Sequence, residues 1–211
     1  AKGACSEGAG AGASPLVSGH SALHESLGKN LSSLLDTEES LIFPSGYAAN
    51  TSIISCLTGP HDLIVSDAHN HASIIDGCRL SGANVQIYPH RDITAAFRLL
   101  RSTPARRRLI VTDSLFSMDG TIAPLADMAQ LADDTKSMLL VDEAHATGVF
   151  GKHGSGLIEK TNTHDGVHIR VGTLSKALGA AGGFVAGNAR LIHWLRHSAR
   201  AWIFSTAHPP S

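Results

Sequence analysis

The sequence predicts an α/β fold of three layers, in which a mostly parallel sheet carries helices on both faces. Short apolar runs of three to five residues recur along the chain, and segments with helical spacing separate them. Gly, Pro, Asp and Ser bound these runs, as is typical of strands buried on both faces. The alternation of strand and helix indicates a parallel sheet.

The expected elements follow one another from residue 41 to residue 141. We expect strands at 41–43, 63–65, 85–88, 109–111 and 138–141, with helices at 47–57, about 72–81, 93–101 and 125–131. Polar residues follow four of these strands, at 45–47, 67–71, 114–120 and 142–145. Because ligands collect at the carboxyl ends of parallel strands, we expect a site there.

Composition narrows the class of protein. The 211 residues, 43% hydrophobic and 17% charged, suit one soluble domain with a sizeable core. The net charge is -1 and the one dense basic run is Arg106 to Arg108, so we expect small-molecule partners and neither nucleic acid nor membrane. Three cysteines without a CxxC pair, and no signal peptide, favour the cytoplasm.

Asp142 and His145 form the first candidate pair. Asp142 ends an apolar run and His145 comes three residues later, so both side chains can point into one crevice. A carboxylate in a dry pocket needs a partner, and a protonated ring nitrogen of a ligand is one such partner. A helix-capping Asp142 and a packed core His145 explain the pattern equally well.

Lys176 lies among small and apolar residues, in the sequence from Val171 to Gly179, with no acid nearby. This context predicts an amine shielded from water, whose lowered pKa suits a nucleophile or a Schiff base. The alternative is an ordinary lysine whose stem lies on apolar surface and whose head is solvated. The glycine-rich residues from 179 to 183 favour a close approach of the backbone to another group.

Two further segments suit ligand binding. Ser45, Gly46 and Tyr47 open a helix, where free N–H groups can bind a phosphate, although a simple N-cap also explains Ser45. His69 and His71 face opposite sides of an extended segment, which makes a metal hydrolase a weak alternative and leads us to expect no metal site. His71 instead suits a ring stacked on a flat ligand.

Five motifs together resemble the α-oxoamine synthases, a family of fold-type I pyridoxal-phosphate (PLP) enzymes. They are, in chain order, residues 43–50 (FPSGYAAN), 71–74 (HASI), 116–125 (FSMDG with APL), 141–148 (VDEAHATG) and 172–177 (GTLSKA). The resemblance spans essentially the whole chain, and it implies that residues 1–211 form the PLP-binding large domain without the family's N-terminal segment and C-terminal small domain.

The resemblance also implies roles for single residues. Lys176 would bind PLP and move protons at the substrate α-carbon, and Asp142 would pair with the ring nitrogen. His145 and Ser117 would lie near the phenolic oxygen, and His71 would stack on the ring. The expected phosphate ligands are Ser45, Gly46, Tyr47, Thr173 and, from a neighbouring subunit, Thr206. Lys176, His71, Asp142 and His145 form the expected catalytic set.

The implied reaction is the decarboxylative condensation of L-alanine with a pimeloyl thioester, in biotin synthesis, by a homodimer with shared sites. The alternatives are relatives that use glycine, of the 2-amino-3-ketobutyrate CoA ligase or 5-aminolevulinate synthase type, and a non-catalytic partner subunit of the same fold. The sequence departs from the family at Asp113, where Glu is expected, and at His208, where an apolar residue is expected.

Overall fold

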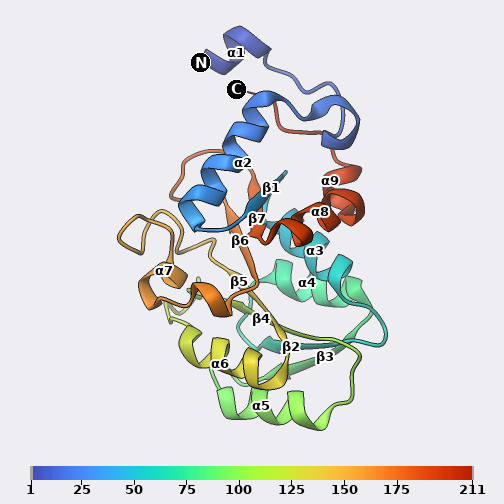
Figure 1. Cartoon of the computed structure of the whole chain (residues 1–211), viewed down its shortest axis with the longest axis vertical. Helices are drawn as coiled ribbons and strands as arrows, with labels where there is room; N and C mark the ends of the chain where they lie inside the picture. The colour runs from blue at the N-terminus through green and yellow to red at the C-terminus, as the bar shows by residue number, and fades with distance from the viewer. Residues whose placement is uncertain (1, 211) are drawn as a thin grey trace.

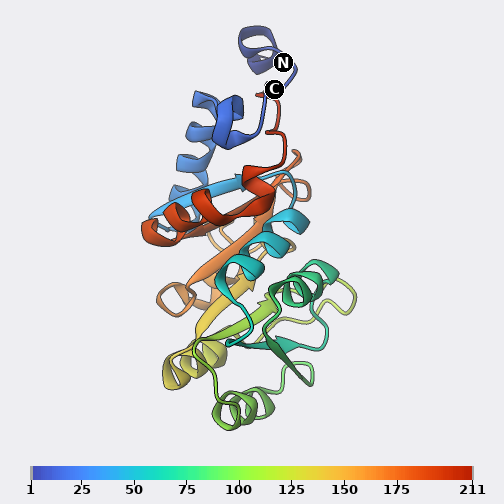
Figure 2. The ribbon, with the colours of Figure 1, turned by 90° about the vertical axis from the view of Figure 1, so that its right-hand side faces the viewer.

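The computed structural model of the chain describes residues 2–210 and contains one seven-stranded sheet between layers of helices (Figure 1). The strand order is β1-β7-β6-β5-β4-β2-β3. The expectation of a three-layer α/β fold with a mostly parallel sheet is therefore confirmed. Figure 2 shows that the chain is drawn out along one axis, with α1 at one end and α5 and α6 at the other.

Six of the strands run in the same direction, and β7 is antiparallel to both of its neighbours, β1 and β6. The strands are β1 (Glu39–Phe43), β2 (Leu63–Asp67), β3 (Asn84–Tyr88), β4 (Arg108–Asp113), β5 (Met138–Asp142), β6 (Ile169–Thr173) and β7 (Gly183–Gly187). The expected strands are confirmed, whereas β6 and β7 were not expected as elements. Phe43 and Thr173 both pair with Gly183, so the carboxyl ends of β1 and β6 flank the start of β7.

The helices cover both faces of the sheet. They are α1 (Lys2–Glu7), α2 (Ala22–Leu35), α3 (Gly46–Leu57), α4 (Ala72–Ser81), α5 (Ile93–Ser102), α6 (Leu125–Thr135), α7 (Leu157–Thr161), α8 (Ala189–Ser198) and α9 (Arg200–Ile203), with short π and 3-10 turns η1 (Pro15–Gly19) and η2 (His164–Gly166). The four expected helices are confirmed, and α6 extends four residues beyond its expected end.

Alternation along the strands divides the apolar residues between two main cores. In β5, Leu140 packs on the face covered by α3, α4, α8 and α9, whereas Leu139 and Val141 pack on the face covered by α5, α6 and α7. A smaller core joins α2 to β7 through Leu31 and Phe184. Both faces of the central strands are thus buried, which explains why their sequences are continuous apolar runs.

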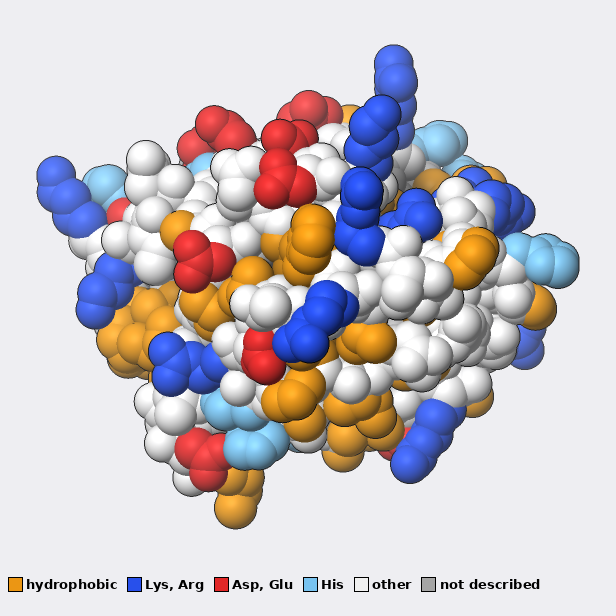
Figure 3. Space-filling model, turned by 90° about the horizontal axis from the view of Figure 1, so that it is seen from below, with side chains coloured by type: hydrophobic (Ala, Val, Ile, Leu, Met, Phe, Trp, Pro, Cys, Tyr) orange, Lys and Arg blue, Asp and Glu red, His pale blue; other side chains and the backbone are white. Residues whose placement is uncertain are grey.

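The outer surface is mixed in character. On the face seen from below, basic side chains lie at separate places among acidic and hydrophobic ones (Figure 3). Within residues 2–210, no helix is both long and apolar enough to cross a bilayer. The two ends of the chain lie at the same end of the molecule in both ribbon views, and a hydrogen bond from Ala207 N to Ala13 O joins the two terminal segments.

Candidate functional site

The candidate site lies at the carboxyl edge of the parallel strands, where the sequence predicts it. Asp113 and Asp142 are register partners at the ends of β4 and β5, and Lys176 follows β6. Burial raises the pKa values of Asp113 and Asp142 and lowers that of His145, and the positive charge of Lys176 acts on all three, against the shift of the two acids and with that of His145. Residues from three neighbouring strand ends therefore form one electrostatic group.

Asp142 is a buried carboxylate held by two donors. Its Oδ2 accepts a hydrogen bond from Asn50 Nδ2 at 2.6 Å, and its Oδ1 accepts one from Ala144 N at 2.8 Å. Burial raises its pKa, while the bonds from Asn50 and Ala144 and the charges of Lys176 and His71 oppose that shift. Asp142 therefore caps a turn after β5 rather than the helix of the alternative interpretation, because residues 144–149 form turns.

Asp113 is the second buried acid of the site. Burial first and the neighbouring Asp142 second raise its pKa to about 8, against a hydrogen bond from the His71 N–H at 2.8 Å. Asp142 has two donors and Asp113 has one, so hydrogen bonds oppose the upward shift of the pKa more at Asp142 than at Asp113. The residue that departs from the family pattern is thus a second buried carboxyl group coupled to Asp142.

A chain of hydrogen bonds connects His71 to Asp142. Asn50 Nδ2 donates to Ser73 Oγ at 2.9 Å as well as to Asp142, and Ser73 Oγ lies 2.7 Å from His71 Nδ1. Ser73 N also donates to His71 Nδ1, which is therefore an acceptor. His71 is exposed at the start of α4, where it is the N-cap residue.

His145 is half-buried beside these groups. Burial lowers its pKa, as do the charges of Lys176 and His71, whereas Asp142 raises it. These couplings place His145 with Asp142 and Lys176, as the sequence predicts. A neutral imidazole of this kind can donate or accept a hydrogen bond near pH 7.

The expectation that Lys176 is shielded from water is wrong for this chain. Residues 175–181 form an exposed loop between β6 and β7. The apolar residue before the loop, Leu174, turns away into the core with Leu31 and Phe184, so it does not cover the amine. The charge of Lys176 nevertheless opposes the rise that burial causes in the pKa values of Asp113 and Asp142.

The start of α3 is packed tightly against β6 and β7. Ser45 Oγ accepts a hydrogen bond from Ala48 N, so its N-cap role is confirmed. A Cβ on Gly46 would lie 3.3 Å from Thr173 Cβ, and a Cβ on Gly183 would lie 2.4 Å from Gly46 N. Glycines at these two positions let the start of α3 pack closely on β6 and β7, and the free N–H groups of that helix end are of the kind that bind anions.

The remaining predicted residues lie at the rim or outside the group. Tyr47 is exposed and donates through its hydroxyl to Asp76 on α4. Thr173 is buried, and its Oγ1 donates to Gly182 O. Ser117 is exposed on the turn after β4, and Thr206 is exposed in the C-terminal segment. The role expected of Thr206 concerns a neighbouring subunit and stays a prediction.

Sequence reasoning missed Asn50 as a site residue, although it lies in a quoted motif. Its amide reaches Asp142 from 92 positions away, which no local pattern indicates. Its Oδ1 is buried and has no hydrogen-bond partner among the described residues. An unpaired acceptor beside a buried carboxylate suits a ligand that carries a protonated ring nitrogen.

Comparison with known proteins agrees with this geometry. The family model for aminotransferase class I and II matches residues 2–211. The 8-amino-7-oxononanoate synthase of Citrifermentans bemidjiense is 51% identical over 205 residues, which are 97% of this chain and 53% of the relative. The chain therefore spans about half the length of the curated relatives it matches.

Solved structures show the same likeness. A serine palmitoyltransferase from S. paucimobilis with bound PLP–myriocin aldimine has a TM-score of 0.95 and 33% identity, over 99% of this chain and 53% of that one. The 8-amino-7-oxononanoate synthase of Francisella tularensis has a TM-score of 0.82 and 30% identity, over 99% and 58%. The resemblance to the α-oxoamine synthases is confirmed, and the chain belongs to the aminotransferase class I and II family.

Proposed function

We propose that this chain is the cofactor-binding large domain of a PLP-dependent 8-amino-7-oxononanoate synthase. The observation that carries the proposal is the meeting of the Lys176 charge with a buried, hydrogen-bonded Asp142 at one sheet edge. The 51% identity with the curated 8-amino-7-oxononanoate synthase of Citrifermentans bemidjiense supports the choice of reaction. Because the chain spans about half of each relative, the activity is proposed for the whole protein.

The residues present fit PLP. Asp142 and the unpaired Asn50 Oδ1 are buried acceptors, and a protonated ring nitrogen would satisfy both. Lys176 would hold the cofactor, His71 would stack on its ring, and His145 and Ser117 would lie near its phenolic oxygen. The phosphate would take N–H groups at Gly46 and Tyr47, with the hydroxyls of Ser45, Thr173 and, across a dimer, Thr206.

Bound PLP would supply an electron sink for the electron pair left on the substrate α-carbon. Lys176 Nζ would remove the α-proton of L-alanine and return a proton to the product. Asp142, whose charged form the hydrogen bonds from Asn50 and the Ala144 N–H favour, would pair with the positive charge of the ring nitrogen. The overall reaction joins L-alanine and a pimeloyl thioester of CoA or acyl carrier protein and releases 8-amino-7-oxononanoate, carbon dioxide and the free thiol.

We also propose a cytoplasmic homodimer. Large apolar side chains in the segments that follow β4, β5 and β6 are exposed. The exposed fractions are 91% for Met118, 60% for Val149 and 37% for Leu178. A second copy that covered them would also exclude water from Lys176, which restores the shielding that the sequence predicts for this amine.

The test uses full-length protein supplied with PLP. We expect a visible absorption band of the bound cofactor that shifts with L-alanine more than with glycine, and carbon dioxide release when a pimeloyl thioester is added. Lys176→Ala should abolish the lysine-bound form, whereas the exposed Lys152→Ala should change nothing. Circular dichroism checks that both variants fold.

Each failure has its own meaning. Absence of the band in the full-length protein refutes the cofactor assignment. A band that responds to glycine in preference to L-alanine replaces the proposed synthase by a glycine-using relative. A normal band with no turnover of any acyl thioester indicates the non-catalytic partner subunit.

A further inference from the structure

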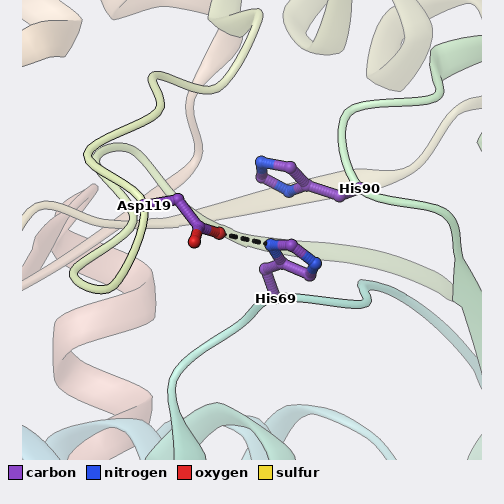
Figure 4. Close-up of side chains that lie close together, drawn as sticks. All are labelled: His69, His90 and Asp119. Atoms are coloured by element: carbon purple, nitrogen blue, oxygen red, sulfur yellow. Dashed lines mark hydrogen bonds and ion pairs between the residues drawn. The ribbon is translucent and has the colours of Figure 1, made fainter.

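A second group of possible ligands lies outside the residues proposed to hold PLP. His69 follows β2, His90 follows β3, and Asp119 lies on the turn after β4 (Figure 4). One ligand atom from each of the three lies within 4.8 Å of the others. His69 Nδ1 lies 2.7 Å from Asp119 Oδ2, and the rings of His69 and His90 stack with centroids 4.1 Å apart.

His90 is held in one orientation by a buried carboxylate. Asp67 Oδ1 accepts hydrogen bonds from the His69 N–H at 2.8 Å and from His90 Nδ1 at 2.9 Å. Asp67 Oδ2 accepts a further bond from Arg91 N. The oxygen that faces His90 already accepts the His69 N–H, so it accepts from His90 as well and the proton of His90 is on Nδ1.

The other nitrogen of His90 is therefore the one that can bind a metal ion. Its Nε2 lies 2.8 Å from Thr121 Oγ1, which donates to it in the absence of a metal. Phe116 packs edge-on against the ring, with centroids 4.4 Å apart, and fixes its plane. A carboxylate bonded to the far nitrogen is the usual outer partner of a metal-binding histidine, since it sets the tautomer and raises the basicity of the ligand.

The other two ligands are within reach of solvent. The side chains of His69 and Asp119 are 47% and 45% exposed, so an ion can enter and a water molecule can complete its coordination. Two imidazole nitrogens and one carboxylate oxygen, with an open fourth position, form a donor set that suits zinc and its neighbours in the first transition row.

We propose that His69, His90 and Asp119 bind one divalent metal ion of the zinc type. The ion would take the Nε2 of His90, one imidazole nitrogen of His69 and the carboxylate of Asp119. A metal ion lies in the plane of each ring that binds it, so the exposed ring of His69 would turn out of its stack on His90. It would join the loops after β2, β3 and β4. His69 and Asp119 are two positions from His71 and Ser117, so the ion would fix both edges of the proposed cofactor pocket, but its binding does not require PLP.

Cobalt titration of the full chain tests the proposal. Wild type should bind one Co²⁺ per chain with visible d–d absorption, and Zn²⁺ should displace it. His69→Phe keeps a ring for the stack on His90 but removes the ligand, and Asp119→Asn keeps the shape of the side chain. Each should weaken Co²⁺ binding by about tenfold to 100-fold or more, because loss of an outer partner alone has that effect.

The matched control is His153→Phe. His153 Nδ1 also lies 2.7 Å from a carboxylate, that of Glu159, but within residues 2–210 no third ligand accompanies that pair. This variant should bind Co²⁺ like wild type. Zn²⁺ should also raise the melting temperature of wild type and His153→Phe but not of His69→Phe.

Two results would overturn the proposal. One is a wild-type chain, folded by circular dichroism, that binds no Co²⁺. The other is a His69→Phe chain that binds like wild type. His193 and His197 are one turn apart on α8 with ring centroids 4.9 Å apart, so a signal lost only in His193→Phe would assign the ion to α8 instead.

Discussion

Replacement of Asp113 by Asn should stabilise the cofactor-free chain, and the gain should grow with pH. The pKa of Asp113 is about 8 in the folded chain, against an ordinary value of 3.8. Between these values the folded chain must keep a proton that the unfolded chain has lost. Wild-type stability therefore falls as pH rises through this window, by about 1.4 kcal/mol per pH unit.

Between pH 5 and pH 7 the difference in unfolding free energy between Asp113→Asn and wild type should rise by about 2.7 kcal/mol. Asn can still accept the His71 N–H through its amide oxygen, so the loop after β2 should keep its position. Urea unfolding at several pH values measures the difference, and the exposed Asp133→Asn should show none. A difference that stays constant with pH would refute the assignment of the proton to Asp113.

Three other substitutions test the packing around the site, each by urea unfolding. Asn50→Ala removes a donor from the buried Asp142 and should cost about 1–3 kcal/mol; a smaller loss would mean that water replaces the amide. Gly183→Ala places a Cβ 2.4 Å from Gly46 N and should cost about 1–3 kcal/mol and weaken PLP binding; normal binding would show that the start of α3 moves freely. Ile53→Ala, at a fully buried position on α3, should cost about 2–5 kcal/mol, and a loss below 1 kcal/mol would contradict the packing described.

The central strands could be predicted because a strand buried on both faces has a continuous apolar sequence. Leu63, Ile64 and Val65 are all fully buried, and their run is apolar throughout. The same reasoning predicts β3 but cannot place it at the edge of the sheet, where Ile87 is 67% exposed. A run of three or four residues indicates a strand without indicating its neighbours.

The direction of β7 could not be predicted. The glycines from 179 to 183 were expected to mark a close backbone approach, and Gly183 makes one to the start of α3, but nothing indicated a strand there. The sequence of β7, mostly glycine and small apolar residues, does not indicate whether the strand is parallel or antiparallel to its neighbours. The direction follows from pairing with β1 and β6, which are distant in sequence.

In the candidate site, too, some residues could be predicted from the sequence and some contacts could not. Asp142 and His145 could be predicted because a polar residue that ends an apolar run must lie at a strand end. The exposure of Lys176 could not, because the apolar neighbour Leu174 packs on α2 and leaves the lysine uncovered. The bond from Asn50 to Asp142 depends on how α3 lies over β5, which is a property of the whole fold.

The position of β1 has a consequence for synthesis of the chain. Strands β2 to β6 can pair with one another as they leave the ribosome, but β1 lies at the sheet edge and pairs with β7. β1 is synthesised before the other strands but cannot pair until β7 has been synthesised, while the chain grows at about 5–20 residues per second. Leu41 and Phe43 stay without their final neighbours during that interval, and closure over so long a separation is slow. We expect nascent chains that stop before β7 to aggregate through β1.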